Sequence, residues 1–386
     1  MRNVAAEVAV IGAGPAGLCA AYQARSAGAD VLLIDENKLP GGQLFKQIHK
    51  FFGSGEHQAG VRGFDIAKAL LTRVAESGVR VKLDSLVYGI QPDKSMGLLD
   101  AEENCLLRAE KVVIAAGAKE NYTPFAGSTL PGVIGAGAAQ TMIHINRVLP
   151  GKRVVMVGAG NVGLIVSYQL LQAGAEVAAV VEAAPRIGGY GVHAAKIRRA
   201  GVPIYVGHTI SRAYGGTDGG GDCGAGAGGV EHVEIVRLDE NWRPVAGSEF
   251  TLDADTVCLA VGLSPMTELI WMAGCRFEYI PAFGGHVPLH DHNMETTVGG
   301  LYVAGDVTGV EEASTAMEEG GLAGVAAAEA LGYLSASAAA RKKAEIAARL
   351  NSLREGPFGD ARRAAKEKQL AAMARFCSCE AERGAV

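Results

Sequence analysis

One glycine pattern, Gly-x-Gly-x-x-Gly, directly follows an apolar, strand-like run at two places in this sequence and constrains the fold more than any other feature. The copies lie at residues 12–17 and 158–163. Each copy follows a run typical of a buried strand, precedes a segment of helical composition, and leads to a second apolar run that ends in an acid. Strand, glycine turn, helix, strand and acid in this order are typical of the βαβ unit that binds a dinucleotide. Two copies therefore predict two bound nucleotides.

In the first copy each glycine has a physical role. Gly12 permits the tight turn, Gly14 lets the backbone approach a pyrophosphate, and Gly17 lets helix and strand pack closely. The N-terminus of the following helix offers unpaired N–H groups to the phosphates. Asp35 ends the second strand, where a carboxylate accepts hydrogen bonds from ribose hydroxyls. The residues predicted to bind this nucleotide are Gly12, Gly14, Pro15, Ala16, Gly17, Asp35 and Glu36.

Three later segments favour FAD over NAD at this first site. Residues 40–43 can form a turn that brings the chain back over the flavin, and residues 112–117 are a buried strand that ends in small residues. Residues 301–306 are another such strand, which ends in Gly-Asp shortly before a predicted helix. Asp306 is expected to hold the ribityl or phosphate region, and the helix N-terminus to face the electron-rich end of the reduced ring. These segments add Gly42, Gln43, Ala116, Gly117, Gly305, Asp306 and Ala313 to the predicted site.

The second copy predicts a site for another adenine nucleotide. Glu182 closes its second strand as Asp35 does in the first copy, which favours NAD over NADP because a 2′-phosphate would be repelled. Arg186 nearby weakens this preference. ADP or ATP as a structural ligand, or an empty site on an inherited fold, are alternatives. The predicted residues are Gly158, Gly160, Asn161, Val162, Gly163, Glu182 and Gly262.

We predict an α/β fold of two nested Rossmann-like FAD/NAD(P)-binding domains, the first of them discontinuous, plus a helical C-terminal extension. The predicted crossovers between the domains lie near Pro124 and Pro281. Charges interleaved on an Ala-rich background at 341–368 are interpreted as the solvated face of surface helices. The predicted boundaries are 1–120 with 285–335 for the first domain, 121–284 for the second, and 336–386 for the extension.

Composition excludes several other classes. The net charge of −5 without a basic stripe argues against nucleic-acid binding, and no apolar stretch is long enough to predict a membrane span. Seven scattered cysteines favour thiols in a reducing cytoplasm. Neither C-x-x-C nor C-x-x-x-x-C occurs, so dithiol chemistry beside a flavin is not expected. Hydride transfer at the flavin remains, with the protein supplying position and electrostatics.

Candidate catalytic residues lie in the segment 43–57, which follows the predicted flavin turn. Lys46 near the ring would stabilise an anionic reduced flavin, and His49 could act as an acid or base near neutral pH. Solvated or hydrogen-bonded loop residues are the alternative for each. His286, His290 and His292 lack a regular ligand spacing and are interpreted as loop residues, so no metal site is predicted.

This layout resembles the two-dinucleotide-binding-domain flavoproteins, such as thioredoxin and glutathione reductases. Residues 115–118, 124–133 and 137–140 give a closer resemblance, to the α subunits of dye-linked L-proline dehydrogenase and heterotetrameric sarcosine oxidase and to subunits of hydrogen cyanide synthase and opine oxidase. The similarity spans roughly residues 7–333. It implies FAD, a nucleotide in the middle domain, an amine or amino-acid substrate, and two partners, which are a small iron–sulfur protein and a flavoprotein β subunit.

The sequence departs from this family at its C-terminal cysteines. Relatives often carry C-x-C followed by C-x-x-C, whereas here only Cys377 and Cys379 occur near the end. Two thiolates do not supply the four ligands of an iron–sulfur cluster. A partner that completes the site, a vestigial pair and a redox pair are the alternatives.

The expected function is that of an FAD-dependent oxidoreductase that acts as the α subunit of an amine or amino-acid dehydrogenase complex. It would transfer hydride or electrons between FAD and NAD(H) or a partner's redox centre. The alternatives are a freestanding NAD(P)H:acceptor oxidoreductase and a structural nucleotide-binding subunit.

Overall fold

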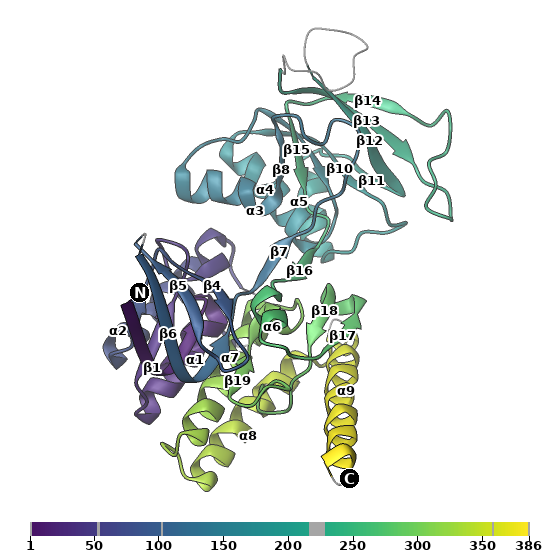
Figure 1. Ribbon diagram of the computed structural model, residues 1–386. Coiled ribbons are helices and arrows are strands. Elements are labelled where there is room, and N and C mark those ends of the chain that lie inside the picture. The colour runs from purple at the N-terminus through teal and green to yellow at the C-terminus, as the bar shows by residue number, and fades with distance from the viewer. Residues whose placement is uncertain (1, 52–54, 102, 216–227, 357–358, 385–386) are drawn as a thin grey trace. The chain divides into compact units, whose positions relative to one another are not determined.

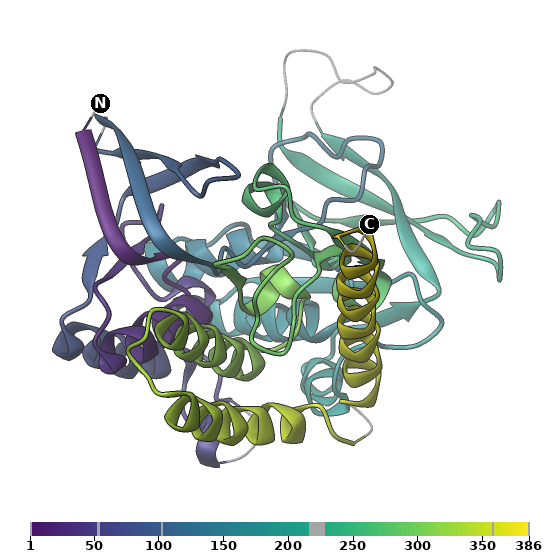
Figure 2. The same ribbon diagram turned by 60° about the horizontal axis from the view of Figure 1, so that its bottom comes forward.

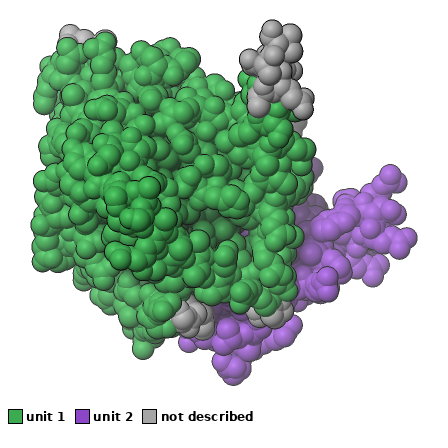
Figure 3. All heavy atoms as spheres, turned by 90° about the horizontal axis from the view of Figure 1, so that it is seen from below, with its two compact units in different colours: residues 1–119, 264–386 green, residues 120–263 purple. Residues whose placement is uncertain are grey.

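The computed structural model describes residues 2–51, 55–101, 103–215, 228–356 and 359–384. The chain divides into two compact units, coloured separately in Figure 3. Unit 1 contains residues 1–119 and 264–386, and unit 2 contains residues 120–263. Unit 1 is therefore discontinuous in sequence. The segments at the two crossovers, β7 (Ala118–Glu120) and β16 (Leu263–Pro265), pair with each other.

The second crossover lies earlier than the sequence suggested, after Leu263 and not near Pro281. The physical reason is helix α6 (Glu268–Met272), whose Ile270 is fully buried in the core of unit 1 beside Val87 and Leu98. The extension predicted as a separate region from residue 336 also belongs to unit 1.

The sheet of unit 1 is built around a parallel core in the order β3-β2-β1-β6-β19. Strand β5 pairs antiparallel with the first half of β6, and β4 pairs antiparallel with β5. Alternate residues of β1 enter different cores: Val8 and Val10 face one side, and Ala9 and Ile11 face the other. The strands are β1 (Arg2–Ile11), β2 (Val31–Ile34), β3 (Arg80–Lys82), β4 (Ser85–Ile90), β5 (Met96–Asp100), β6 (Glu103–Ile114) and β19 (Leu301–Val303).

Helices α1 (Pro15–Ala27) and α7 (Ala313–Ala330) pack directly against each other on one face of this sheet (Figure 1). A Cβ on Gly320 would lie 2.0 Å from the Ala16 carbonyl oxygen, and one on Gly324 would lie 2.3 Å from that of Ala20. The abundance of Gly and Ala in these segments is therefore required by close helix packing. Helix α2 (Gly63–Ser77) also packs on α1.

The C-terminal helices pack at two different places in unit 1, as Figures 1 and 2 show. Helix α8 (Ala336–Leu353) lies against α7, whereas α9 (Asp360–Gly384) lies beside the hairpin of β17 (Phe277–Ile280) and β18 (Gly285–Pro288). The interpretation of 341–368 as a solvated face is wrong for two residues. Arg354 and Lys366 are each only 5% exposed, because buried carboxylates of unit 1 pair with them.

Unit 2 has a five-stranded parallel sheet in the order β11-β10-β9-β15-β8 and a separate antiparallel sheet in the order β12-β13-β14. Its parallel strands are β8 (Val133–Gly135), β9 (Arg153–Val157), β10 (Glu176–Glu182), β11 (Ile204–Val206) and β15 (Thr256–Leu259). Its antiparallel strands are β12 (His208–Gly215), β13 (Val230–Arg237) and β14 (Phe250–Asp253). Its helices are α3 (Ala136–Gln140), a π-helical turn (Thr141–Asn146), α4 (Asn161–Ala173) and α5 (Gly191–Arg199).

Within the described ranges, no helix combines the length and apolar character that crossing a membrane requires.

Candidate nucleotide-binding sites

The first turn, residues 12–17, joins β1 to α1, and two of its glycines are fixed by packing. Gly12 has a φ of +103°, and a Cβ there would lie 2.3 Å from the carbonyl oxygen of Ala115, which directly follows the neighbouring strand β6. A Cβ on Gly17 would lie 1.7 Å from the Gly12 carbonyl oxygen. Any larger residue at either position would force the turn away from the sheet, so these two glycines shape the turn and do not themselves need a ligand.

Gly14 differs from these two because space remains beside it. A Cβ on Gly14 would meet nothing closer than the Gly42 Cα at 4.0 Å. Gly14 caps α1 without a side-chain hydrogen bond, and the first turn of α1 contains no acid. The N–H groups and the positive end of the helix dipole are therefore available to an anion. This arrangement fits a pyrophosphate.

Asp35 is held beside the first turn by backbone donors. Its Oδ2 accepts a hydrogen bond from the Ala13 N–H at 2.6 Å, and its Oδ1 accepts one from the Asn37 N–H at 2.8 Å. The side chain is buried, whereas the neighbouring Glu36 is exposed. A carboxylate fixed in this way keeps further lone pairs for ribose hydroxyls, so the geometry supports the predicted role of Asp35 better than that of Glu36.

A Gly-Gly pair closes over the first turn. The Gly41 N–H donates to the Ala13 carbonyl at 2.7 Å, and a Cβ on Gly42 would lie 2.9 Å from the Gly14 Cα. The 3₁₀ turn η1 (Gly42–Lys46) follows. It contains the exposed Gln43 and ends with the half-buried Lys46.

His49 and His57 follow η1 in different environments. His49 is half-buried, and its ring stacks on Phe51 with centroids 6.1 Å apart. His57 is buried, with its Nε2 3.3 Å from the Glu318 Oε1, a carboxylate that Arg349 also binds through two N–H groups at 2.9 Å. The structure therefore places His57 beside the salt bridge between Glu318 on α7 and Arg349 on α8.

The far segments that were predicted to complete this site come together near the first turn. A Cβ on Gly305, where φ is +75°, would lie 2.9 Å from the Ala16 Cβ, so the Gly305-Asp306 segment packs on α1. The Glu311 N–H donates to the Asp306 Oδ1 at 3.3 Å. Gly117, with a φ of +78°, has no atom within 4 Å of where its Cβ would be. Ala116 precedes it, and α7 begins at Ala313 as predicted.

The charge state of Asp306 depends on its surroundings. Burial, together with the nearby carboxylates of Glu319 and Glu311, raises the pKa of its carboxyl from 3.8 to about 7. When folding raises the pKa of a group, its contribution to the free energy of unfolding is fully present at pH values below its pKa in the unfolded protein. This contribution is lost as the pH rises to its pKa in the folded protein. The FAD-free protein therefore loses this contribution between about pH 4 and pH 7.

Asp306→Asn should remove this pH dependence because the amide stays neutral. The loss of unfolding free energy between pH 5 and pH 8 should be smaller in FAD-free Asp306→Asn than in the parent, by roughly 1–3 kcal/mol. Urea unfolding of both proteins at the two pH values measures the difference. Comparing the two proteins cancels titrations elsewhere, and equal losses in both would contradict the raised pKa of Asp306.

The second turn, residues 158–163, repeats the construction of the first. A Cβ on Gly158, where φ is +107°, would lie 2.3 Å from the Ala260 carbonyl oxygen, and one on Gly163 would lie 2.0 Å from that of Gly158. Gly160 has no atom within 4 Å of where its Cβ would be. As in the first turn, the outer glycines are fixed by packing, and the middle one leaves space for a ligand.

Glu182 occupies the place of Asp35. Its Oε2 accepts a hydrogen bond from the Ala159 N–H at 2.7 Å and its Oε1 from the Ala184 N–H at 2.9 Å. Arg186, which weakened the preference for NAD, is exposed. Val162 is also exposed, at 42%, and Gly262 has a φ of +104°.

Sequence reasoning missed a Gly-Gly pair at the second turn, Gly188-Gly189. The Gly189 N–H donates to the Ala159 carbonyl at 2.9 Å, and a Cβ there would lie 2.8 Å from the Gly160 carbonyl carbon. The Asn161 Oδ1 accepts a hydrogen bond from the next backbone N–H, that of Tyr190, at 2.8 Å. The recurrence of Gly-Gly after each strand-ending acid is the pattern that could have identified this pair.

The cysteines do not assemble a redox or metal site in the described part of the chain. Burial raises the pKa of the Cys19 thiol to about 12 and that of Cys258 still further, which disfavours the reactive thiolate. Cys377 and Cys379 are exposed on α9, and side chains two residues apart on a helix do not face each other. Among the described residues, no three His, Cys, Asp or Glu side chains gather as metal ligands would.

Comparison with known proteins agrees with this geometry. Residues 6–320 match the family described as pyridine nucleotide-disulphide oxidoreductase. An opine oxidase subunit of Agrobacterium tumefaciens (strain Ach5) is 30% identical, over 97% of this chain and 76% of its own length. Hydrogen cyanide synthase subunit HcnB of Pseudomonas aeruginosa is 25% identical, over 96% of this chain and 82% of its own.

A solved structure, that of L-proline dehydrogenase from P. horikoshii, has a TM-score of 0.66 at 20% identity. The match covers 91% of this chain and 59% of that one. Together with the sequence matches, it confirms the predicted resemblance and the predicted α/β fold with Rossmann-like sheets and C-terminal helices.

Proposed function

Because the chain belongs to the pyridine nucleotide-disulphide oxidoreductase family, we propose that it binds FAD at the first turn and NAD(H) at the second. It is an FAD-dependent oxidoreductase related to subunits of multi-subunit dehydrogenases. In the proposed reaction it passes hydride or electrons between FAD and NAD(H) or a partner's redox centre. The observation that carries this proposal is the repeated construction of the two turns, each with an open middle glycine and a carboxylate fixed by backbone N–H groups.

The assignment of FAD to the first turn rests on features that complete it from elsewhere in the chain. The Gly305-Asp306 segment packs on Ala16, and α7 begins shortly after it. In the proposal, the α1 N-terminus holds the pyrophosphate, Asp35 binds the ribose and Asp306 binds the ribityl or phosphate region. When bound, FAD supplies the hydride and electron chemistry.

Lys46 and His49 are the residues proposed to support that chemistry. Both are half-buried and follow the Gly-Gly pair that closes over the first turn. A lysine ammonium beside the flavin stabilises negative charge on the reduced ring, and an imidazole moves a proton near neutral pH. Disulfide reduction is not proposed, because no C-x-x-C or C-x-x-x-x-C occurs in the sequence.

We propose further that the chain acts as the α subunit of an amine or amino-acid dehydrogenase complex. Two of the relatives bear names that identify them as subunits, of opine oxidase and of hydrogen cyanide synthase. The proposed partners are a small iron–sulfur protein and a flavoprotein β subunit. Cys377 and Cys379 are exposed on α9, so a partner that supplies further ligands could reach them.

Anaerobic mixing with NADH tests the proposed exchange between the two nucleotides. NADH should bleach the visible absorbance of the FAD-loaded protein, because the second turn holds the nicotinamide nucleotide that reduces the flavin. Flavin that stays oxidised when NADH is mixed with the chain and with its reconstituted complex would contradict the NAD(H) assignment.

A freestanding NAD(P)H:acceptor oxidoreductase is the second candidate, since one chain carries both nucleotide turns. Turnover with a soluble electron acceptor separates the two proposals. Full-rate turnover by the purified chain alone would favour the freestanding enzyme, whereas a requirement for the products of neighbouring genes would favour the complex.

A further inference from the structure

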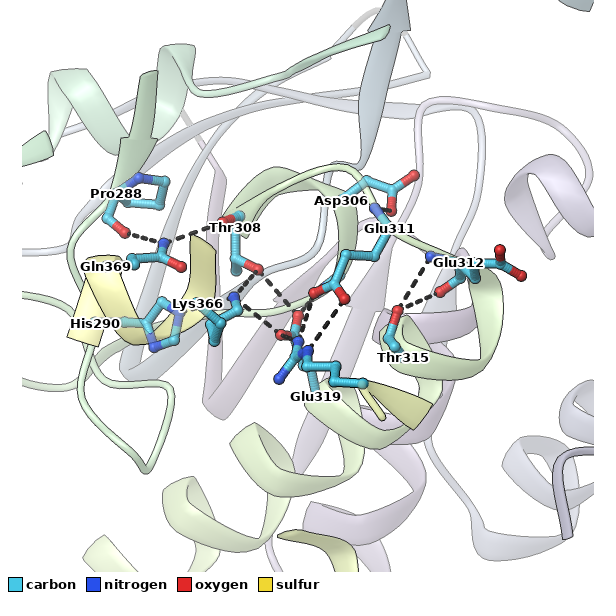
Figure 4. A network of polar contacts seen from close by, with 12 residues as sticks. Pro288, His290, Asp306, Thr308, Glu311, Glu312, Thr315, Glu319, Lys366 and Gln369 are labelled. Carbon is cyan, nitrogen blue, oxygen red and sulfur yellow. Dashed lines mark hydrogen bonds and ion pairs between the residues drawn. The ribbon is translucent and has the colours of Figure 1, made fainter. Parts of the chain in front are cut away.

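Two cations near the C-terminus are buried against carboxylates of α7 and the segment before it (Figure 4). Arg354 follows α8, and its guanidinium lies 2.6 Å from the Glu319 Oε1 and 2.5 Å from the Glu311 Oε1. Lys366 lies on α9, and its ammonium is 3.1 Å from the same Glu319 oxygen. The C-terminal segment therefore supplies the positive charge that balances two buried acids.

One of these acids, Glu319, holds the segment that carries Asp306, and the other, Glu311, belongs to that segment. The Glu319 Oε2 accepts hydrogen bonds from the Gly305 N–H at 3.1 Å and from the Thr308 hydroxyl at 3.0 Å. Glu311 donates its N–H to the Asp306 Oδ1 at 3.3 Å. We call residues 305–312 the Asp306 loop. Its start is bonded to Glu319, and Glu311 lies within it.

Helix α9 also contacts the Asp306 loop directly. The Lys366 ammonium donates to the Thr308 hydroxyl at 3.2 Å, and one turn further along α9 the Gln369 amide donates to the Thr308 carbonyl at 3.0 Å. Thr308 is fully buried by these contacts. The loop is thus held by α7 on one side and α9 on the other.

His290 completes the surroundings of Lys366. Its Nε2 lies 3.3 Å from the Lys366 ammonium, and its Nδ1 lies 2.8 Å from the Asp291 carbonyl oxygen. Burial, together with the charge of Lys366, lowers the pKa of His290 to about 4, so the ring is neutral. With the Nδ1 proton donated to the carbonyl, Nε2 accepts from Lys366, so His290 adds no positive charge beside Glu319 and Lys366 does.

Removing one cation would leave buried negative charge uncompensated. Burial alone would raise the pKa of Glu319, but Lys366 and Arg354 lower it to about 2. A buried carboxylate that loses its partner moves toward water or takes up a proton. Either change weakens its hydrogen bonds to Gly305 and Thr308.

We infer that Arg354 and Lys366 are positioning residues for the flavin: by neutralising Glu319 and Glu311, they hold the Asp306 loop in the conformation that binds FAD. This inference rests on the proposed binding of FAD at the first turn. It makes the C-terminal helices part of the flavin site, although neither cation need touch the cofactor.

Lys366→Met in the full chain tests the inference, with Lys368→Met as the matched control. Lys368 lies on the same helix but is exposed and donates to the Tyr279 carbonyl. The FAD dissociation constant, measured by fluorescence titration, should rise about tenfold or more in Lys366→Met and stay at the parental value in Lys368→Met. Equal dissociation constants in all three proteins would overturn the inference.

Two further measurements separate loop positioning from a general loss of structure. Amide hydrogen exchange in the FAD-free Lys366→Met protein should speed up in residues 305–312 and remain slow in β1 and β2, and unchanged exchange in the loop would overturn the inference.

Adding Glu319→Gln removes the uncompensated charge, so the double variant should bind FAD more tightly than Lys366→Met alone. If Lys366 had only a structural role, the double variant would bind FAD no more tightly than Lys366→Met. That result would count against positioning through Glu319.

The outcome for the unsubstituted protein distinguishes the inference from the proposed function. If that protein binds no FAD, the proposed function fails and the flavin role of Lys366 fails with it, whatever the exchange data show. If it binds FAD and Lys366→Met binds equally well, only the inference fails. Should Lys366→Met not fold, Arg354→Met applies the same test, because it removes the other cation that pairs with Glu319.

Discussion

Gly14→Ala is expected to give a folded protein that binds FAD roughly 10–100-fold more weakly than the parent. The backbone at Gly14 is extended, with φ −74° and ψ −174°, which any residue adopts, and the added Cβ would lie 4.0 Å from its nearest neighbour. Folding should therefore be unaffected. The methyl group would instead occupy the space beside the α1 N-terminus where the pyrophosphate is proposed to lie. FAD titration of the purified variant measures the effect.

Gly17→Ala is the control, because this turn glycine should give the opposite result. Its Cβ would lie 1.7 Å from the Gly12 carbonyl oxygen, so α1 would have to move off the sheet. We expect this variant to lose about 1–3 kcal/mol or more of stability. Thermal unfolding of both FAD-free variants separates the two effects. Parental FAD affinity in Gly14→Ala would show that the phosphates do not lie over this glycine.

Glu182→Arg is expected to slow reduction of the bound flavin by subsaturating NADH about 100-fold and to leave the FAD content unchanged. The Glu182 carboxylate accepts two backbone N–H groups and is proposed to accept ribose hydroxyls as well. A guanidinium only donates, so each of these hydrogen bonds would be lost, and hydrogen bonds to charged groups contribute about 1.5–3 kcal/mol each. Anaerobic stopped-flow mixing with NADH measures the rate.

Glu176→Gln is the matched control for Glu182→Arg. Glu176 lies at the other end of β10, where its carboxylate pairs with Arg153 at the surface. The flavin bound to Glu176→Gln should therefore be reduced by NADH at the parental rate. The same mixing with NADPH is informative, because an arginine beside the ribose favours a 2′-phosphate. Equal rates with NADH in Glu182→Arg and the parent would show that the nicotinamide nucleotide does not bind at the second turn.

The parts of the sites that sequence predicts are those whose requirements are local. Gly12 and Gly17 must be glycine because of contacts within one βαβ unit, so their spacing alone identifies them. Gly188-Gly189 follows β10 in the chain and closes over the second turn through the hydrogen bond from the Gly189 N–H to the Ala159 carbonyl. It lies outside the βαβ unit, so the spacing of the turn glycines does not identify it. Comparison of the two copies would have identified it, because Gly41-Gly42 follows Asp35 in the same way.

The parts that sequence does not predict depend on tertiary partners. Arg354 and Lys366 stand among interleaved charges that resemble a solvated face, and nothing local shows that Glu319 binds them. The same limit explains the misplaced crossover. Residues 264–284 carry no Gly-x-Gly-x-x-Gly motif, and the burial of Ile270, Ala273 and Cys275 in the core of unit 1 shows to which unit they belong.

The flavin content of the purified protein is the most direct test of the account. After incubation with FAD and removal of the excess, the absorption spectrum should show the two visible bands of a bound flavin, at one flavin per chain. A chain that stays colourless under these conditions, while its circular dichroism shows the folded α/β structure, would contradict the assignment of the first turn.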